Sequence, residues 1–179
     1  EAIAIADDTM TAACSHAGPL FIAWAYSACG RAYTASDPNR ALDTFREGLA
    51  YIRQHRMPLQ EAWMAMDAAV LEATHGDLDQ ALDLFAASMD SFFQSGATAF
   101  LAGPFARLVM FFDRTGRPDV AATLCGTAVN PRTYLPQFDG AVDHVRSVLG
   151  TVTFDACVRA GAAMTVTQAV HYAHHHIQL

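Results

Sequence analysis

The residues with the clearest capacity for chemistry are four histidines within the sequence HYAHHH at positions 171–176. On an α-helix, His171, His174 and His175 share one face, and neutral imidazoles at this spacing can hold Zn²⁺ or Ni²⁺. Metal ligands in proteins are normally oriented by further polar partners, and no carboxylate or cysteine follows nearby. We therefore predict a surface or packing role for these histidines, with no functional metal site and no cofactor.

Other reactive groups are dispersed along the chain. The acid pairs Asp7-Asp8 and Asp77 with Asp79 are predicted to be helix-start charges, which the helix macrodipole favours. The four cysteines form no CxxC pair, and their apolar surroundings predict buried free thiols of a cytosolic protein. They are Cys14, Cys29, Cys125 and Cys157. Neither a phosphate-binding Gly-rich loop nor a GxSxG motif occurs, so the sequence favours a protein that is not an enzyme.

Composition narrows the class of protein further. The 179 residues are 53% hydrophobic and 16% charged, which excludes a disordered chain. The formal charge of −7 is not offset by any basic stripe, so direct binding of nucleic acid is not expected. No apolar run is long enough to cross a membrane. The first and last residues both fall inside helical patterns, and we expect a piece of a longer protein.

The histidines, acids and cysteines are positioned by helices that follow a sequence repeat with a period of 40 residues. Alanine recurs at 41, 81 and 121, and a larger residue follows each alanine by four positions, as Phe45, Phe85 and Cys125. A small residue four before a large one puts both on one helix face, where a neighbouring helix can approach closely. Phe92-Phe93 and Phe111-Phe112 are predicted to anchor the core of this repeat.

Capping residues divide each repeat into two helices, a first (A) and a second (B). Asp37-Pro38, Gly76-Asp77 and Gly116 with Pro118 mark helix ends and starts, and Thr165 with Gln168 forms a capping box. The predicted helices are 1–14, 19–34, 38–56, 58–75, 78–95, 98–115, 118–129, 138–149, 152–160 and 165–178. Proline and asparagine between 130 and 136 break the pattern. Gly103-Pro104 is expected to start or kink the third A helix.

The expected fold is an all-α solenoid of antiparallel helix pairs with a C-terminal helical cap. Residues 1–179 form one domain in this interpretation, divided as 1–18 (truncated repeat), 19–57, 58–96 and 97–130 (repeats), and 131–179 (C-terminal helices). Gly30-x2-Tyr33 in the A helix and Ala-x3-Phe in the B helix resemble the tetratricopeptide repeat (TPR). The usual TPR period is about 34 residues, so these helices are longer.

Two stretches also resemble a family of large actinobacterial regulators. The segment from Gly116 to Ala128 resembles a repeat near the end of STAND-type ATPases, and the stretch from Leu149 to Ala173 resembles their C-terminal tail. Those proteins often carry an adenylate-cyclase-like domain or a LuxR-type helix-turn-helix. The resemblance covers about residues 36–175 and implies a helical-repeat region that senses an effector or partner. None of the ATPase, cyclase or DNA-binding motifs lies in this chain.

In a TPR array the A helices line the inner groove, so their residues that do not pack are candidates for binding. Starting from Gly30 and adding 40, the candidate positions are Trp24, Ser27, Arg31, Thr34, Met64, Asp67, Leu71, His75, Pro104, Arg107, Phe111 and Arg114. We select eight of them: Trp24, Ser27, Arg31, Asp67, His75, Arg107, Phe111 and Arg114. Their mixture of aromatic and charged side chains suits a peptide or a small polar ligand.

Two functions remain open, and a third, an enzyme or a metal protein, depends on the histidine tail alone. The chain is either a sensor or interaction domain of a cytoplasmic signal-transducing ATPase regulator, or a passive structural module that relays between neighbouring domains. Saturable ligand or partner binding separates the two. We also expect homodimerisation through residues 1–14, since a truncated solenoid exposes a stacking face.

Overall fold

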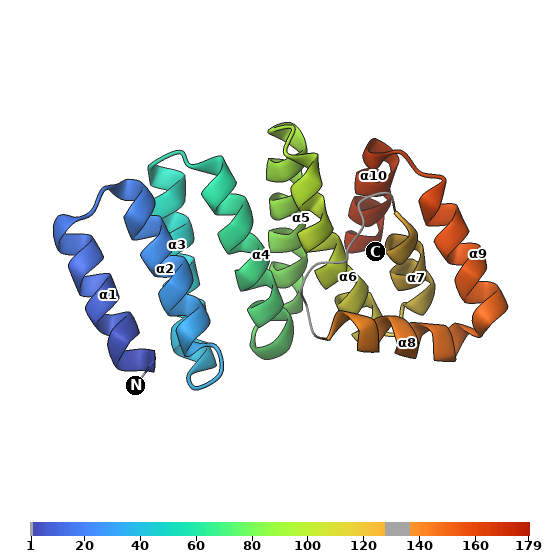
Figure 1. Cartoon of the computed structure of the whole chain (residues 1–179), viewed down its shortest axis with the longest axis horizontal. Helices are drawn as coiled ribbons and strands as arrows, with labels where there is room; N and C mark the ends of the chain where they lie inside the picture. Colours follow the sequence, from blue (N-terminus) through green and yellow to red (C-terminus); the bar gives the residue numbers. More distant parts are fainter. Residues whose placement is uncertain (1, 128–136) are drawn as a thin grey trace. The chain divides into compact units, whose positions relative to one another are not determined.

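The chain folds into helices that begin and end close to the predicted residues. The computed structural model describes residues 2–127 and 137–179, except for the side chains of residues 2 and 16. The described residues contain helices and no strand, so the predicted all-α class is confirmed. The helices, shown in Figure 1, are α1 (Ala2–His16), α2 (Pro19–Tyr33), α3 (Pro38–Gln54), α4 (Pro58–His75), α5 (Leu78–Gln94), the 3₁₀ helix η1 (Thr98–Leu101), α6 (Ala102–Arg114), α7 (Pro118–Gly126), α8 (Phe138–Leu149), α9 (Thr151–Ala162) and α10 (Val166–Ile177).

Local capping explains these boundaries. Asp37 accepts the Arg40 backbone N–H at 3.1 Å, and Asp77 accepts those of Asp79 and Gln80 at 2.8 and 3.2 Å. Gly116 follows α6 with a φ of +76°, a backbone conformation that favours glycine. The Thr165–Gln168 capping box is present at the start of α10. The predicted end of the helix at residues 128–129 and the predicted break at 130–136 lie outside the described residues.

The third predicted A helix is divided in two. Residues 98–101 form the 3₁₀ helix η1, and the α-helix α6 begins at Ala102. Pro104 lies in the first turn of α6, where its missing N–H costs no helical hydrogen bond. The proline therefore lies within the first turn of this helix and does not interrupt it.

The described residues divide into two compact units, residues 1–91 and 92–179. In the first unit α2 packs against α1 and α3, and α4 packs against α3 and α2. Its core is an apolar cluster from α1 to α4 that includes Phe45, Leu49, Ile52 and Met64. Close approach is possible because Gly30 faces the Phe45 ring: a Cβ on Gly30 would lie 2.5 Å from that ring.

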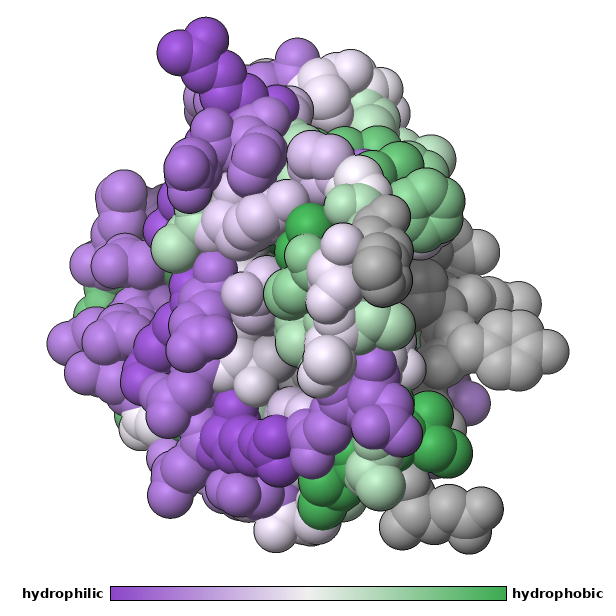
Figure 2. All heavy atoms as spheres, turned by 90° about the vertical axis from the view of Figure 1, so that its left-hand side faces the viewer, coloured by the Kyte–Doolittle hydropathy of each residue, from purple (hydrophilic) through white to green (hydrophobic). Residues whose placement is uncertain are grey.

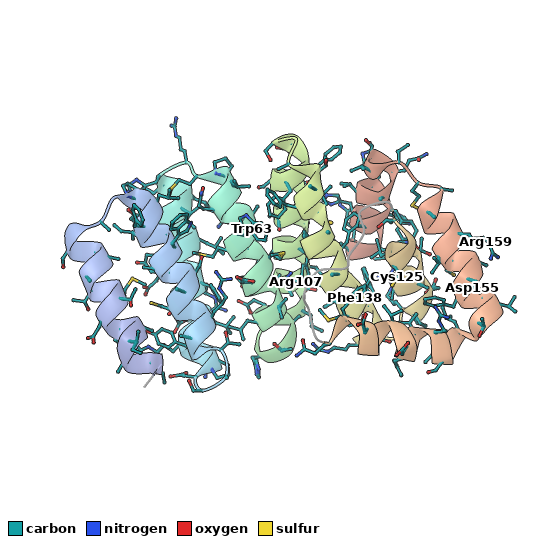
Figure 3. All side chains as sticks on the ribbon, viewed as in Figure 1. Trp63, Arg107, Cys125, Phe138, Asp155 and Arg159 are labelled. Atoms are coloured by element: carbon teal, nitrogen blue, oxygen red, sulfur yellow. The ribbon has the colours of Figure 1, made fainter. Side chains whose placement is uncertain are left out.

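In the second unit α7 is central, because it packs against α6, α8, α9 and α10. Phe92, Phe111 and Phe112 are buried, as expected for core anchors, and Phe93 is half-buried. Burial raises the pKa of the Cys125 thiol to about 12. Figure 3 labels Cys125 on α7 and Phe138, a buried residue at the start of α8.

The predicted burial of the cysteines is correct for Cys29 and wrong for Cys14. All four thiols are free; Cys29 is buried, Cys125 and Cys157 are half-buried, and Cys14 is exposed. The neighbours of α1 are α2, which packs along it, and Arg40 of α3, which pairs with Asp7, and they leave Cys14 exposed. Burial in this helix follows the face that meets α2 rather than the apolar character of the sequence.

The outer face of α1 is mixed in polarity. Figure 2 shows the side of the molecule on which α1 lies, with hydrophilic residues over much of the surface and hydrophobic residues in smaller areas. Ile5 is the one large hydrophobic residue exposed on the described part of α1, beside exposed Asp8, Thr9 and Ser15. Dimerisation through this helix stays a prediction, with little apolar area to drive it.

None of the described helices has both the length and the apolar character needed to span a lipid bilayer.

Candidate functional site: the α2–α4 face and its neighbouring clefts

Two tryptophans are exposed on helices of the first unit that pack against each other. Trp24 on α2 is 54% exposed and Trp63 on α4 is 39% exposed. The two helices pack against each other and lie next to one another in Figure 1, and Figure 3 labels Trp63 on α4. Leu20 and Leu59 are exposed one turn before the tryptophans. We call this surface, made of Leu20, Trp24, Leu59 and Trp63 with Arg31 and Asp67, the α2–α4 face.

The pairing of these residues comes from equivalent helix starts. Proline is the first residue of both helices, at Pro19 and Pro58, which sets an offset of 39 residues between them. Proline is favoured at this position because its φ is already helical. At this offset Trp24 corresponds to Trp63, and both point away from the core.

The same offset corrects the predicted groove. Adding 40 to Trp24 gives Met64, which is fully buried. Adding 40 to Arg31 gives Leu71, which was predicted to line the groove but is also buried. Trp63 was missed for this reason. Measuring from the two prolines instead of from the B-helix alanines would have found it.

Two of the predicted residues meet across the face. The Arg31 guanidinium lies 3.5 Å from an Asp67 carboxylate oxygen, joining α2 to α4. Arg31 is exposed and Asp67 is half-buried, so the ion pair is worth at most about 1 kcal/mol. The pair lies one turn after Trp63 on α4 and two turns after Trp24 on α2, and charged residues are common at the rim of binding surfaces.

The other predicted residues have different locations. Ser27 is half-buried on α2, and His75 is exposed in the last turn of α4. Arg107 and Arg114 lie on α6 in the second unit, half-buried and exposed respectively, and Figure 3 labels Arg107. Phe111 is only 7% exposed and packs edge-on against Phe112, so it belongs to the core and not to a groove surface.

A cleft of about 480 Å³ opens between α1, α2 and α3. Within it the Tyr33 hydroxyl donates to Asp7 Oδ1 at 2.5 Å, and Arg40 pairs with the same oxygen. The Arg40 guanidinium also stacks over the Tyr33 ring, 4.1 Å from its centroid. Asp7 therefore lies in the middle of α1 and binds across the cleft, so its prediction as a helix-start charge is wrong.

The geometry of this cleft shifts two pKa values. The hydrogen bond from Tyr33 and the charge of Arg40 lower the pKa of Asp7 below 3.8. Burial and the hydrogen bond to Asp7 raise the pKa of Tyr33 to about 12. Both shifts favour the state in which Tyr33 is protonated and Asp7 is ionised.

The stabilisation that Tyr33 contributes is expected to disappear in strong alkali. Since its folded pKa is raised above 10.0, this contribution is complete below pH 10.0 and is lost as the pH rises through about 12. A spectrophotometric tyrosinate titration of the chain should contain a late component near pH 12 that Tyr33→Phe removes. An unchanged late component in the variant would contradict this assignment.

The next repeat builds an equivalent cleft with different charges. A second cleft, of about 260 Å³, lies between α3, α4 and α5. It is lined by Arg46, Leu49 and Glu72, which lie 39 residues after the first-cleft residues Asp7, Met10 and Tyr33. Glu72 is 2% exposed. It accepts from Arg46 at 2.8 Å and from the Asp77 backbone N–H at 3.0 Å. A buried acid here replaces the tyrosine of the first cleft.

The glycine after α4 makes this arrangement possible. A Cβ on Gly76 would lie 1.9 Å from Glu72 Oε2, the oxygen that receives the Asp77 N–H. Gly76 thus leaves room for the carboxylate to reach the start of α5. Sequence reasoning predicted the glycine as a helix end but did not find its partner Glu72.

The four histidines of the C-terminal tail have different surroundings. The described residues contain no group of three or more His, Cys, Asp or Glu side chains placed to share one metal ion. His171 and His175 are exposed, whereas His174 is half-buried. His176 contacts Arg117, which also donates to the His176 carbonyl at 2.6 Å. The contact with Arg117 is a packing role of the kind predicted for the cluster.

No protein-family model, curated protein or solved structure matches this chain.

Proposed function

We propose that this chain is a non-catalytic, TPR-like binding domain whose α2–α4 face holds a segment of a partner polypeptide. One observation carries the proposal: Trp24 and Trp63 occupy equivalent positions on neighbouring helices and are both exposed. Burying tryptophan is favourable, and exposed tryptophans on neighbouring helices are typical of protein interfaces. The leucines one turn away and the Arg31–Asp67 pair extend the surface with apolar and charged contacts.

The place of this domain in a larger protein is part of the same proposal. Its helix pairs, with Ala41 and Ala81 fully buried in successive B helices, agree with stacked TPR-like repeats of about 40 residues. The resemblance to STAND-type regulators suggests that it is the sensor region of a cytoplasmic signal-transducing ATPase. A passive relay without a partner of its own is the alternative.

Tryptophan fluorescence gives a direct test, because Trp24 and Trp63 are the only two tryptophans of the chain. A displayed library of random peptides is selected against the wild-type chain, and each binder is then titrated while the emission is followed. Binding at the α2–α4 face is expected to shift the emission to shorter wavelength as the indoles leave water. Trp63→Ala should weaken binding by about 2 kcal/mol or more, roughly 30-fold, as for an interface hot spot.

The matched control is Val152→Ala, which removes an exposed apolar side chain of α9 in the second unit and should leave affinity unchanged. If binders are found whose affinity does not depend on Trp24 or Trp63, the α2–α4 face is not the binding surface. If no binder is obtained, the passive module becomes the better interpretation.

A further inference from the structure

The structure separates the tail histidines into engaged and available groups. On α10, His176 is held by Arg117 through both its ring and its carbonyl, and its ring packs against Tyr172. His171 and His175 are exposed and make no hydrogen bond within the described residues, although the His175 ring also contacts the His176 ring edge-on, with 5.2 Å between the ring centroids. Two imidazoles are therefore available for a ligand, and they are four residues apart on the same helix.

Both available imidazoles open into one cleft. His171 and His175 line a space of about 520 Å³ between α9 and α10. The other residues around it are Ala160, Ala163, Met164, Thr167, Gln168 and Tyr172. Side chains four apart on a helix lie about 5–6 Å from one another at Cβ, and this is the spacing by which paired helical histidines chelate one metal ion.

We propose that His171 and His175 form a two-ligand site for a divalent first-row transition-metal ion, with Cu²⁺ preferred over Ni²⁺ and Zn²⁺. Imidazole nitrogen suits these ions, and copper binds most tightly in the usual order of affinities. The cleft is lined by no carboxylate, so Mg²⁺ and Ca²⁺, which require oxygen ligands, are not expected to bind.

The position of His175 on α10 also favours the binding of a cation. His175 lies in the last turn of α10, where the helix macrodipole presents partial negative charge and favours a cation. Arg117, which contacts His176 in this turn of α10, does not line the cleft. Two protein ligands leave the remaining coordination positions to water or to a donor atom of another molecule.

Calorimetric titration of the untagged chain with CuCl₂, NiCl₂, ZnCl₂ and MgCl₂ tests the site. We expect one tightly bound Cu²⁺ per chain, weaker Ni²⁺ and Zn²⁺, and no heat from Mg²⁺. His171→Ala and His175→Ala should each weaken Cu²⁺ binding by at least about 10–100-fold, the loss that even an outer partner of a metal site produces. Both side chains are exposed, so neither change should affect folding.

The matched control is His144→Ala, which removes an exposed histidine of α8 in the same unit and should leave Cu²⁺ affinity unchanged. Electron paramagnetic resonance of the copper-loaded chain should show two imidazole nitrogens coupled to the metal, and one in each ligand variant. Wild-type affinity in His171→Ala, or equal losses in His171→Ala and His144→Ala, would overturn the proposal. So would the absence of any Cu²⁺ binding by the wild-type chain.

Discussion

Replacing Gly161 with alanine is expected to destabilise the second unit by about 3 kcal/mol, the upper part of the usual range for overpacking. A Cβ at this position would lie 1.9 Å from the Thr123 carbonyl oxygen and 3.2 Å from the Gly126 carbonyl carbon. Both are backbone atoms of α7, which cannot rotate away as a side chain can. The two helices would have to separate along the contact that holds α9 to the centre of this unit.

The contact is reciprocal, which provides a second variant. A Cβ on Gly126 would lie 2.0 Å from the Val158 carbonyl oxygen of α9. Gly126→Ala should therefore lose a similar free energy of unfolding. Because both changes break the same helix contact, the double variant should lose less than the sum of the two single variants.

Gly140→Ala is the matched control. This glycine lies within α8, and a Cβ there would meet no atom within 4 Å. Alanine is the better helix former, so this variant should gain about 0.5–1 kcal/mol. Urea denaturation followed by circular dichroism measures the wild type and the four variants, and equal midpoints for Gly161→Ala and Gly140→Ala would contradict the close approach of α7 and α9.

Removing the Glu72 carboxylate is expected to have the next largest effect, a loss of about 2–3 kcal/mol in Glu72→Ala. The loss has two sources: the Asp77 N–H at the start of α5 loses its acceptor, and a buried side chain leaves a space between α3, α4 and α5. Arg46 is about half exposed, so its guanidinium can return to water and the loss stays below that of a fully buried ion pair.

A conservative variant separates charge from shape. Glu72→Gln keeps the volume and one acceptor for the Asp77 N–H but removes the charge that pairs with Arg46. We expect it to lose about 1 kcal/mol, the net value of a hydrogen bond. The control is Glu61→Gln at the more exposed pair with Arg53, which should cost less than about 1 kcal/mol. If thermal unfolding shows a larger loss of stability in Glu61→Gln than in Glu72→Ala, Glu72 has no structural role.

The sequence by itself determined the helices of this protein. Prolines at 38, 58 and 118, the Asp77 cap and the Thr165–Gln168 box act on neighbouring backbone atoms, so their effect is visible without a fold. The all-α class follows from the same local signals. Burial of the recurring alanines at 41, 81 and 121 was also predictable, because a small residue repeated at a fixed spacing indicates where two helices pack closely together.

The tertiary structure decided which side chains meet and which remain exposed. The A helices are offset by 39 residues, one less than the B helices, and a one-residue change rotates a helix by about 100°, exchanging Met64 for Trp63 at the surface. Asp7 and Glu72 gained their partners from residues 26 or more positions away. An acid in the last turn of a helix, as at Glu72, is unfavourable locally and was the one sequence signal that a distant partner exists.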